Sequence, residues 1–229
     1  MGGSHQECGG LFRRQSGGQE PTRRGVGSDV DFTDCFRHRC WHFIDVAFAQ
    51  DGTTNLPPTP VPNAQERIGV FRPVLGGAMT KTSKPTICRG CCTSSGTSTN
   101  RTTRVSQSQT HGDAGGNLIT VTTGNSDQKL HLYWDDLLGS SSANAKNVAA
   151  SAMNLAAADA TKASDLDVGH WVAEGIQNAK DSVYTSPVGA GAGPFTLTEN
   201  YKNPAKALAK KQVALAGARL ANLLNSQLK

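Results

Sequence analysis

Apolar residues recur at helical intervals through most of the second half of this 229-residue chain. The segments 129–138, 144–163 and 167–184 each carry that pattern and predict helices. The strongest helical pattern follows at 203–228, with Pro204 placed in its first turn. Its predicted apolar face consists of Val213, Leu215, Leu220 and Leu223.

The first half of the chain has weaker patterns. After a compact apolar segment at 40–48, four prolines exclude a helix or a central strand over the next stretch. Asn63 is a predicted N-cap for a helix over 64–75, which Pro73 should end or kink. Its apolar positions are Ile68, Phe71 and Leu75. Alternating β-branched residues predict one small hairpin near 117–124, so the predicted fold class is all-α with one hairpin.

The net charge of +5 arises in the first half of the chain. Residues 1–104 carry 13 Lys/Arg against 8 Asp/Glu, whereas residues 105–229 carry 10 of each. A basic half is compatible with nucleic-acid binding, but no Lys/Arg run with interleaved aromatics supports it. Residues 1–28 predict a disordered or misassigned leader and contain no apolar stretch typical of a signal peptide. No apolar run is long enough to predict a membrane span.

The cysteines do not form a disulfide framework. Cys88, Cys91 and Cys92 lie within five residues, too close to pair usefully with one another, and the other three are scattered. These three cysteines could form a zinc knuckle in a non-catalytic helical binding module. That alternative lacks a second Cys/His pair at the spacing of a zinc finger.

Two polar side chains are candidate metal ligands. His131 and Asp135 are four residues apart, which on a helix places an imidazole and a carboxylate one turn apart on one face. The same spacing also occurs in ordinary helix-surface pairs, and Trp134 between them is most simply a core residue. The glycine cluster at 113–117 could form a phosphate-binding nest, although such clusters more often close a turn.

Taken in order, several motifs resemble the S1/P1 nuclease family. They are WHFID, an ERI-FR helix, GDAGGNLITV, LHLYWD and the ending ALAGARLANLLN, spread from about residue 40 to 225 with one break. The resemblance implies an all-helical, phospholipase C-like fold in a single domain over 29–229. It also implies a zinc-dependent hydrolase that cleaves phosphodiester bonds of single-stranded DNA or RNA and of 3′-nucleotides. Members of the family are usually secreted or periplasmic.

The resemblance assigns roles to individual residues. His42, His131 and Asp135 match zinc-binding positions of the family, and Asp29 is a candidate for its metal-bridging aspartate. Phe43 and Asp45 match an aromatic that stacks on the nucleobase and a carboxylate that accepts from the base edge. Stacking on an exposed base favours single strands because a duplex hides that face. A phospholipase C-type phosphodiesterase shares the fold, but the pair on 43 and 45 favours nucleotides. No protein partner is inferred.

The chain departs from the family at two places. Residues 1–28 match neither its N-terminal tryptophan nor the histidine that follows. A central helix with the pattern Leu-Leu-His-x-x-Gly-Asp-x-His-Gln-Pro should precede residue 102, where KPTICRGCCTSSGTSTN stands instead.

The genetic code offers an explanation for the missing helix. Suitable codons for residues 87–101, read from their third base, give Leu-Pro-Trp-Leu-Leu-His-Leu-Val-Gly-Asp-Ile-His-Gln-Pro. We therefore predict that about 76–101 is encoded out of frame and that a second indel near Arg101 restores the frame. Without this helix the zinc cluster lacks ligands that the remaining residues cannot replace, so the chain should have little or no nuclease activity and poor order over 76–104.

Overall fold

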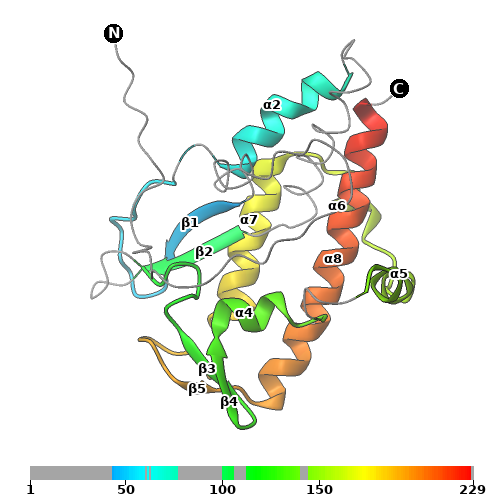
Figure 1. Ribbon diagram of the computed structural model, residues 1–229. Coiled ribbons are helices and arrows are strands. Elements are labelled where there is room, and N and C mark those ends of the chain that lie inside the picture. The colour runs from blue at the N-terminus through cyan, green and yellow to red at the C-terminus, as the bar shows by residue number, and fades with distance from the viewer. Residues whose placement is uncertain are drawn as a thin grey trace, which may run out of the picture.

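The computed structural model describes residues 43–59, 61, 63–76, 100–105, 112–139 and 144–227 (Figure 1). Helices predominate in this part of the chain, which confirms the predicted all-α class. They are α2 (Ala64–Gly76), α4 (Leu130–Asp135), α5 (Ala145–Met153), α6 (Ala160–Ser164), α7 (Val168–Asn178) and α8 (Glu199–Gln227). A π-helical turn, η2 (Ala179–Val183), continues α7.

The strands form two small sheets. The predicted hairpin is present as β3 (Thr120–Thr123) and β4 (Ser126–Lys129), and β5 (Phe195–Thr196) pairs with β3 in parallel. The hairpin extends to Lys129, beyond the predicted boundary. A second, unpredicted sheet pairs β1 (Ile44–Ala49) with β2 (Asn100–Val105) in parallel. Such a pair joins segments about fifty residues apart, so local patterns do not reveal it.

Side chains with short polar groups fix the starts of several helices. The Asn63 side chain accepts from the backbone N–H of Glu66 at 3.2 Å, which confirms it as the N-cap of α2. Asp159 and Asp167 cap α6 and α7 in the same way. Pro73 does not end α2, because the helix continues to Gly76.

Helix α8 differs from its prediction in two respects. It begins at Glu199, so Pro204 lies beyond the first turn. Pro204 cannot donate to the carbonyl of Asn200, but both residues are exposed and water can satisfy that carbonyl. Of the four predicted apolar residues, Val213 is 49% exposed and Leu220 is only partly buried, so neither belongs to the buried face. That face consists of Tyr201, Ala205, Leu215, Ala216, Arg219 and Leu223.

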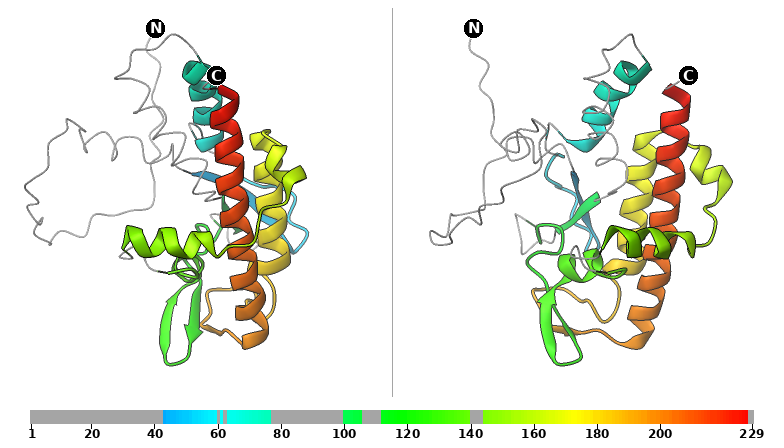
Figure 2. Two further views of the ribbon diagram at one scale, coloured as in Figure 1. Left: turned by 90° about the vertical axis from the view of Figure 1, so that its right-hand side faces the viewer. Right: turned by 45° about the vertical axis from the view of Figure 1, so that its right-hand side comes forward.

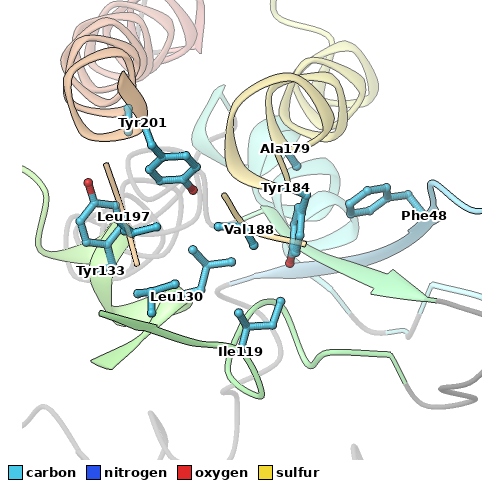
Figure 3. Close-up of a cluster of buried hydrophobic side chains, with 11 residues drawn as sticks. Phe48, Ile119, Leu130, Tyr133, Ala179, Tyr184, Val188, Leu197 and Tyr201 are labelled. Atoms are coloured by element: carbon cyan, nitrogen blue, oxygen red, sulfur yellow. The ribbon is translucent and has the colours of Figure 1, made fainter. Parts of the chain in front are cut away.

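The main core lies where the hairpin, α4, η2 and the start of α8 meet (Figure 3). Ile119, Val121 and Leu130 are at most 1% exposed, and Leu197 packs with them from the β5 strand region. Tyr133 and Tyr201 contribute rings 6.2 Å apart between their centroids. This core therefore fixes α4 against α8 and against the turn that follows α7.

A charged cluster joins α6, α7 and α8. Both views of Figure 2 show α7 beside α8, and the short α6 contacts α8. Arg219 Nη2 donates to Glu174 Oε2 at 2.8 Å, and its Nε donates to the carbonyl of Lys162 at 3.2 Å. Lys162 Nζ donates to Glu174 Oε1 at 2.8 Å. The guanidinium also lies over the ring of Trp171, 5.3 Å from its centroid. The Arg219 side chain is only 10% exposed, so its charge depends on these partners.

A separate, exposed pair, His170 and Asp165, makes the stability of the fold depend on pH. His170 Nδ1 lies 2.9 Å from Asp165 Oδ2, and this hydrogen bond raises the pKa of His170 above its ordinary value. The pair therefore stabilises the fold below the ordinary histidine pKa of about 6.5 and loses its effect as pH rises through the folded pKa. In an NMR titration of the His170 ring, Asp165→Asn should lower the pKa. An unchanged titration would contradict the contact.

Candidate metal-binding site

Helix α4 presents His131 and Asp135 away from the core. The helix follows β4 directly, and Leu130 and Tyr133 anchor it by pointing into the core. His131 is partly buried and Asp135 is half exposed, with side-chain exposures of 22% and 50%. The predicted arrangement of these two residues, one turn apart on one helix face, is therefore what the structure shows.

The imidazole of His131 has a defined orientation. Its Nδ1 lies 3.0 Å from the carbonyl oxygen of Gly115. Because a carbonyl only accepts hydrogen bonds, Nδ1 must carry the proton in this contact. In the neutral ring the lone pair is then on Nε2, which faces Asp135 Oδ2 at 3.3 Å. This places two potential metal-ligand atoms, Nε2 and Oδ2, next to each other.

The same geometry fits a zinc ion as part of a larger ligand set. Ligand atoms about 2.1 Å from one tetrahedral zinc lie about 3.4 Å apart, close to the observed separation of Nε2 and Oδ2. The bond from Nδ1 to a carbonyl is the outer contact that zinc-binding histidines usually make. His131 and Asp135 could thus supply two ligands of a zinc site. Across the described ranges, no group of three or more His, Cys, Asp and Glu side chains is placed to hold a metal ion.

The turn formed by residues 112–118 orients His131. Asp113 is buried, and its Oδ1 accepts from the N–H of Gly116 at 3.2 Å. The N–H groups of Asn117 and Leu118 also bond within the turn. These amides are used internally, which favours a turn over a phosphate-binding nest. Gly116 has φ +82°, and an added Cβ would lie 3.2 Å from the backbone nitrogen of His131, so the close approach to α4 requires glycine.

On its inner side α4 is held by a hydrogen-bonded relay. Trp134 Nε1 donates to Tyr201 Oη at 3.1 Å, and Tyr201 Oη donates to the carbonyl of Val183 at 2.8 Å. Burial raises the pKa of Tyr201, so its hydroxyl remains a neutral donor at all ordinary pH values. Trp134 packs against the core as predicted, but its N–H also ties α4 to α8 and η2. The tyrosine hydroxyl and the Gly115 carbonyl are supporting groups that the sequence pattern did not reveal.

The two candidate base-binding residues lie on a different element. Phe43 immediately precedes β1 and Asp45 lies within it. Ile44 and Phe48 of β1 are buried, at 5% and 3% exposure. Because side chains alternate along a strand, Phe43 and Asp45 share the opposite face. The backbone therefore places both on one side, as joint recognition of a base requires.

Other candidate residues lie outside the described part of the chain. These are Asp29, His42 and the three cysteines Cys88, Cys91 and Cys92, together with the segment 77–99. Among the helices that are described, none is both long and apolar enough to cross a membrane.

Comparison with known proteins identifies the family. No curated protein matches the chain. The sequence model of the S1/P1 nuclease family matches residues 102–229, more than half of the chain. That range contains α4 with His131 and Asp135, the turn that orients the histidine, and the whole of α8. On this match, the chain belongs to the S1/P1 nuclease family.

Proposed function

We propose that this chain is a zinc-dependent endonuclease of single-stranded DNA, RNA and 3′-nucleotides whose activity is impaired in this copy. The observation that carries the zinc dependence is the His131–Asp135 pair, with the imidazole lone pair turned toward a carboxylate oxygen 3.3 Å away. Family membership supports the reaction class. The proposal takes residues 29–229 as one nuclease-like domain, interrupted at about 76–101.

Separate residues of the chain would bind the metal ion and the nucleobase. His131 and Asp135 would hold zinc, while the carbonyl of Gly115 and the Trp134–Tyr201 bond keep the two ligands in register. Phe43 would stack on an exposed base and Asp45 would accept a hydrogen bond from its edge. Bound zinc supplies an activated water and charge neutralisation at the phosphoryl group.

The impairment is supported by where the family match begins. The match starts at residue 102, directly after the segment 76–101 for which the sequence predicts a shifted reading frame. The expected central helix and its ligands belong just before that boundary. Resequencing of the gene tests this part directly, since the nucleotides must read as Leu-Leu-His-Leu-Val-Gly-Asp-Ile-His in another frame.

The substrate class is tested on a frame-restored chain, in which residues 87–100 are replaced by the alternative-frame reading. It should cleave single-stranded oligonucleotides faster than duplex DNA or phospholipid diesters. Phe43→Ala should raise KM for single strands about tenfold, because stacking on one base contributes about 1–3 kcal/mol. Phe43→Trp keeps an aromatic surface and serves as the matched control. Faster hydrolysis of phospholipids would instead favour a phospholipase C-type enzyme.

A further inference from the structure

Three lysines form a stripe along the outside of α8. Lys202, Lys206 and Lys210 follow one another at intervals of four residues, so they lie on one side of the helix with a rise of about 6 Å between neighbours. Lys206 and Lys210 are exposed, and the side chain of Lys202 is 31% exposed. We call these three residues the lysine stripe.

The lysine stripe lies in a strongly basic part of the chain, although residues 105–229 as a whole carry equal numbers of Lys/Arg and Asp/Glu. Residues 105–198 carry four Lys/Arg against nine Asp/Glu, whereas residues 199–229 carry six against one. The single acid is Glu199, which pairs with Lys202 at 2.5 Å. Among the described residues, Lys206 and Lys210 have no acidic partner. An exposed pair such as Glu199–Lys202 is weak and easily exchanged, so all three ammonium groups are available to an anionic ligand.

The packing of α8 restricts which anionic ligand the stripe can take. A basic helix that binds a membrane surface needs an apolar face to insert beside its charges. The apolar face of α8 is already in the core, where Tyr201, Ala205 and Leu223 are at most 5% exposed. Of the described residues of α8, Val213 alone is a large exposed apolar side chain, so the outer face offers charge with little apolar surface to insert. Regularly spaced ammonium groups of this kind suit a chain of phosphates, which each lysine can contact as a point charge.

The stripe starts near α4, the helix that carries the candidate metal site. Lys202 follows Tyr201, whose hydroxyl accepts from Trp134, the residue next to Asp135. Figure 1 shows α4 beside the first part of α8, and the stripe runs from there toward the C-terminal end of the helix. From Lys202 to Lys210 it covers about 12 Å of helix axis.

From these observations we infer that the lysine stripe binds the phosphate backbone of a nucleic-acid strand that also passes the His131–Asp135 site. This inference rests on the proposed function for the identity of the strand. It adds a binding surface outside the reacting centre, with no sequence preference, because lysine contacts to phosphates do not read bases.

The test measures binding of a fluorescent oligo-dT to the full chain in EDTA, which prevents zinc-dependent cleavage. Log Kd is followed against log salt concentration. The triple variant Lys202→Gln, Lys206→Gln, Lys210→Gln should reduce the magnitude of the slope by about 2, because each phosphate contact on a single strand contributes about 0.7. At low salt its affinity should fall at least about tenfold. Gln preserves helix propensity, and thermal unfolding checks that α8 is intact.

A charge-matched control separates the stripe from net charge alone. Lys146→Gln, Lys180→Gln and Lys211→Gln remove the same charge elsewhere, with Lys211 on the other flank of α8, and should leave the slope nearly unchanged. Equal losses in both triple variants overturn the inference. So does a stripe variant that binds oligo-dT like the parent chain, or a parent chain that binds vesicles of phosphatidylserine and phosphatidylcholine more tightly than oligo-dT. Failure of the proposed zinc chemistry leaves this readout unaffected, because binding is measured without metal.

Discussion

The frame-restored chain should bind zinc at least about a hundredfold more tightly than the chain as written and gain zinc-dependent cleavage of single-stranded DNA. Loss of an outer-shell contact alone typically lowers metal affinity 10–100-fold, and the restored helix returns direct ligands. Under the proposed assignment, His131 and Asp135 supply only two of the four ligands of a tetrahedral ion, so zinc on the present chain should exchange readily. Equilibrium titration against a zinc indicator measures the affinities, and a fluorogenic single strand reports cleavage.

Two controls make this result specific. In the first control, residues 87–100 are again replaced by the alternative-frame reading, but its two histidines and its aspartate are changed to alanine. This variant regains the apolar helix face without the ligands, so it should bind zinc no more tightly than the present chain. His131→Ala in the frame-restored chain should return the affinity most of the way to the present value. Measurable zinc-dependent cleavage by the purified chain as written contradicts the prediction of impairment.

The second large effect concerns the charged cluster between α7 and α8. Glu174→Ala should destabilise the fold by about 3 kcal/mol, because it leaves the buried guanidinium of Arg219 without its carboxylate. For a protein of this size that corresponds to a fall in Tm of about 6–12 °C. Differential scanning calorimetry at neutral pH measures the change.

The control variants test whether the effect comes from the isolated charge. Lys162→Ala removes an exposed partner of the same carboxylate and should cost less than about 1 kcal/mol. The double replacement Glu174→Leu, Arg219→Met removes both charges and should recover most of the loss. A Glu174→Ala protein that melts within about 2 °C of the parent rejects this account, since that shift corresponds to less than about 1 kcal/mol.

The same cluster predicts how the fold responds to acid. Burial alone would raise the pKa of Glu174, but hydrogen bonds from Lys162 and Arg219 outweigh it and hold the pKa below its ordinary value. The stabilisation is therefore present above the ordinary pKa of about 4.3 and is lost as pH falls through the lower, folded pKa. Glu174→Gln should remove this acid-dependent part of the unfolding curve.

The sequence pattern predicted the local features of the fold better than its long-range ones. The helices predicted over 64–75 and 129–138, the N-cap at Asn63 and the hairpin all depend on neighbouring residues. The structure has them as α2, α4, the Asn63 cap and β3–β4. The parallel β1–β2 pair depends on residues distant in the chain, so no local pattern predicts it. The position of Pro204 predicts a later start for α8 than the structure has, because proline is typical of a first turn. Exposure at this site lets water replace the lost hydrogen bond, so the helix begins earlier, at Glu199.

For the candidate site, the spacing predicted that His131 and Asp135 lie together on one helix face, but not which groups hold them there. A separation of four residues in a helix is enough to place His131 and Asp135 together. The carbonyl of Gly115 is a backbone atom, and its contact with His131 depends on the fold of a turn. Tyr201 lies sixty-seven residues from Trp134, so their hydrogen bond also follows only from the tertiary packing.

The contact between Gly115 and His131 has a consequence for the history of this gene. The histidine ring is held by a backbone carbonyl and α4 is held by the core, so neither needs a metal ion to stay in place. A lineage that lost the central helix would then keep the His131–Asp135 pair as a by-product of selection for stable packing. Under the shifted-frame proposal, reversion would require correction of the two indels, with no re-evolution of His131, Asp135 or their supports.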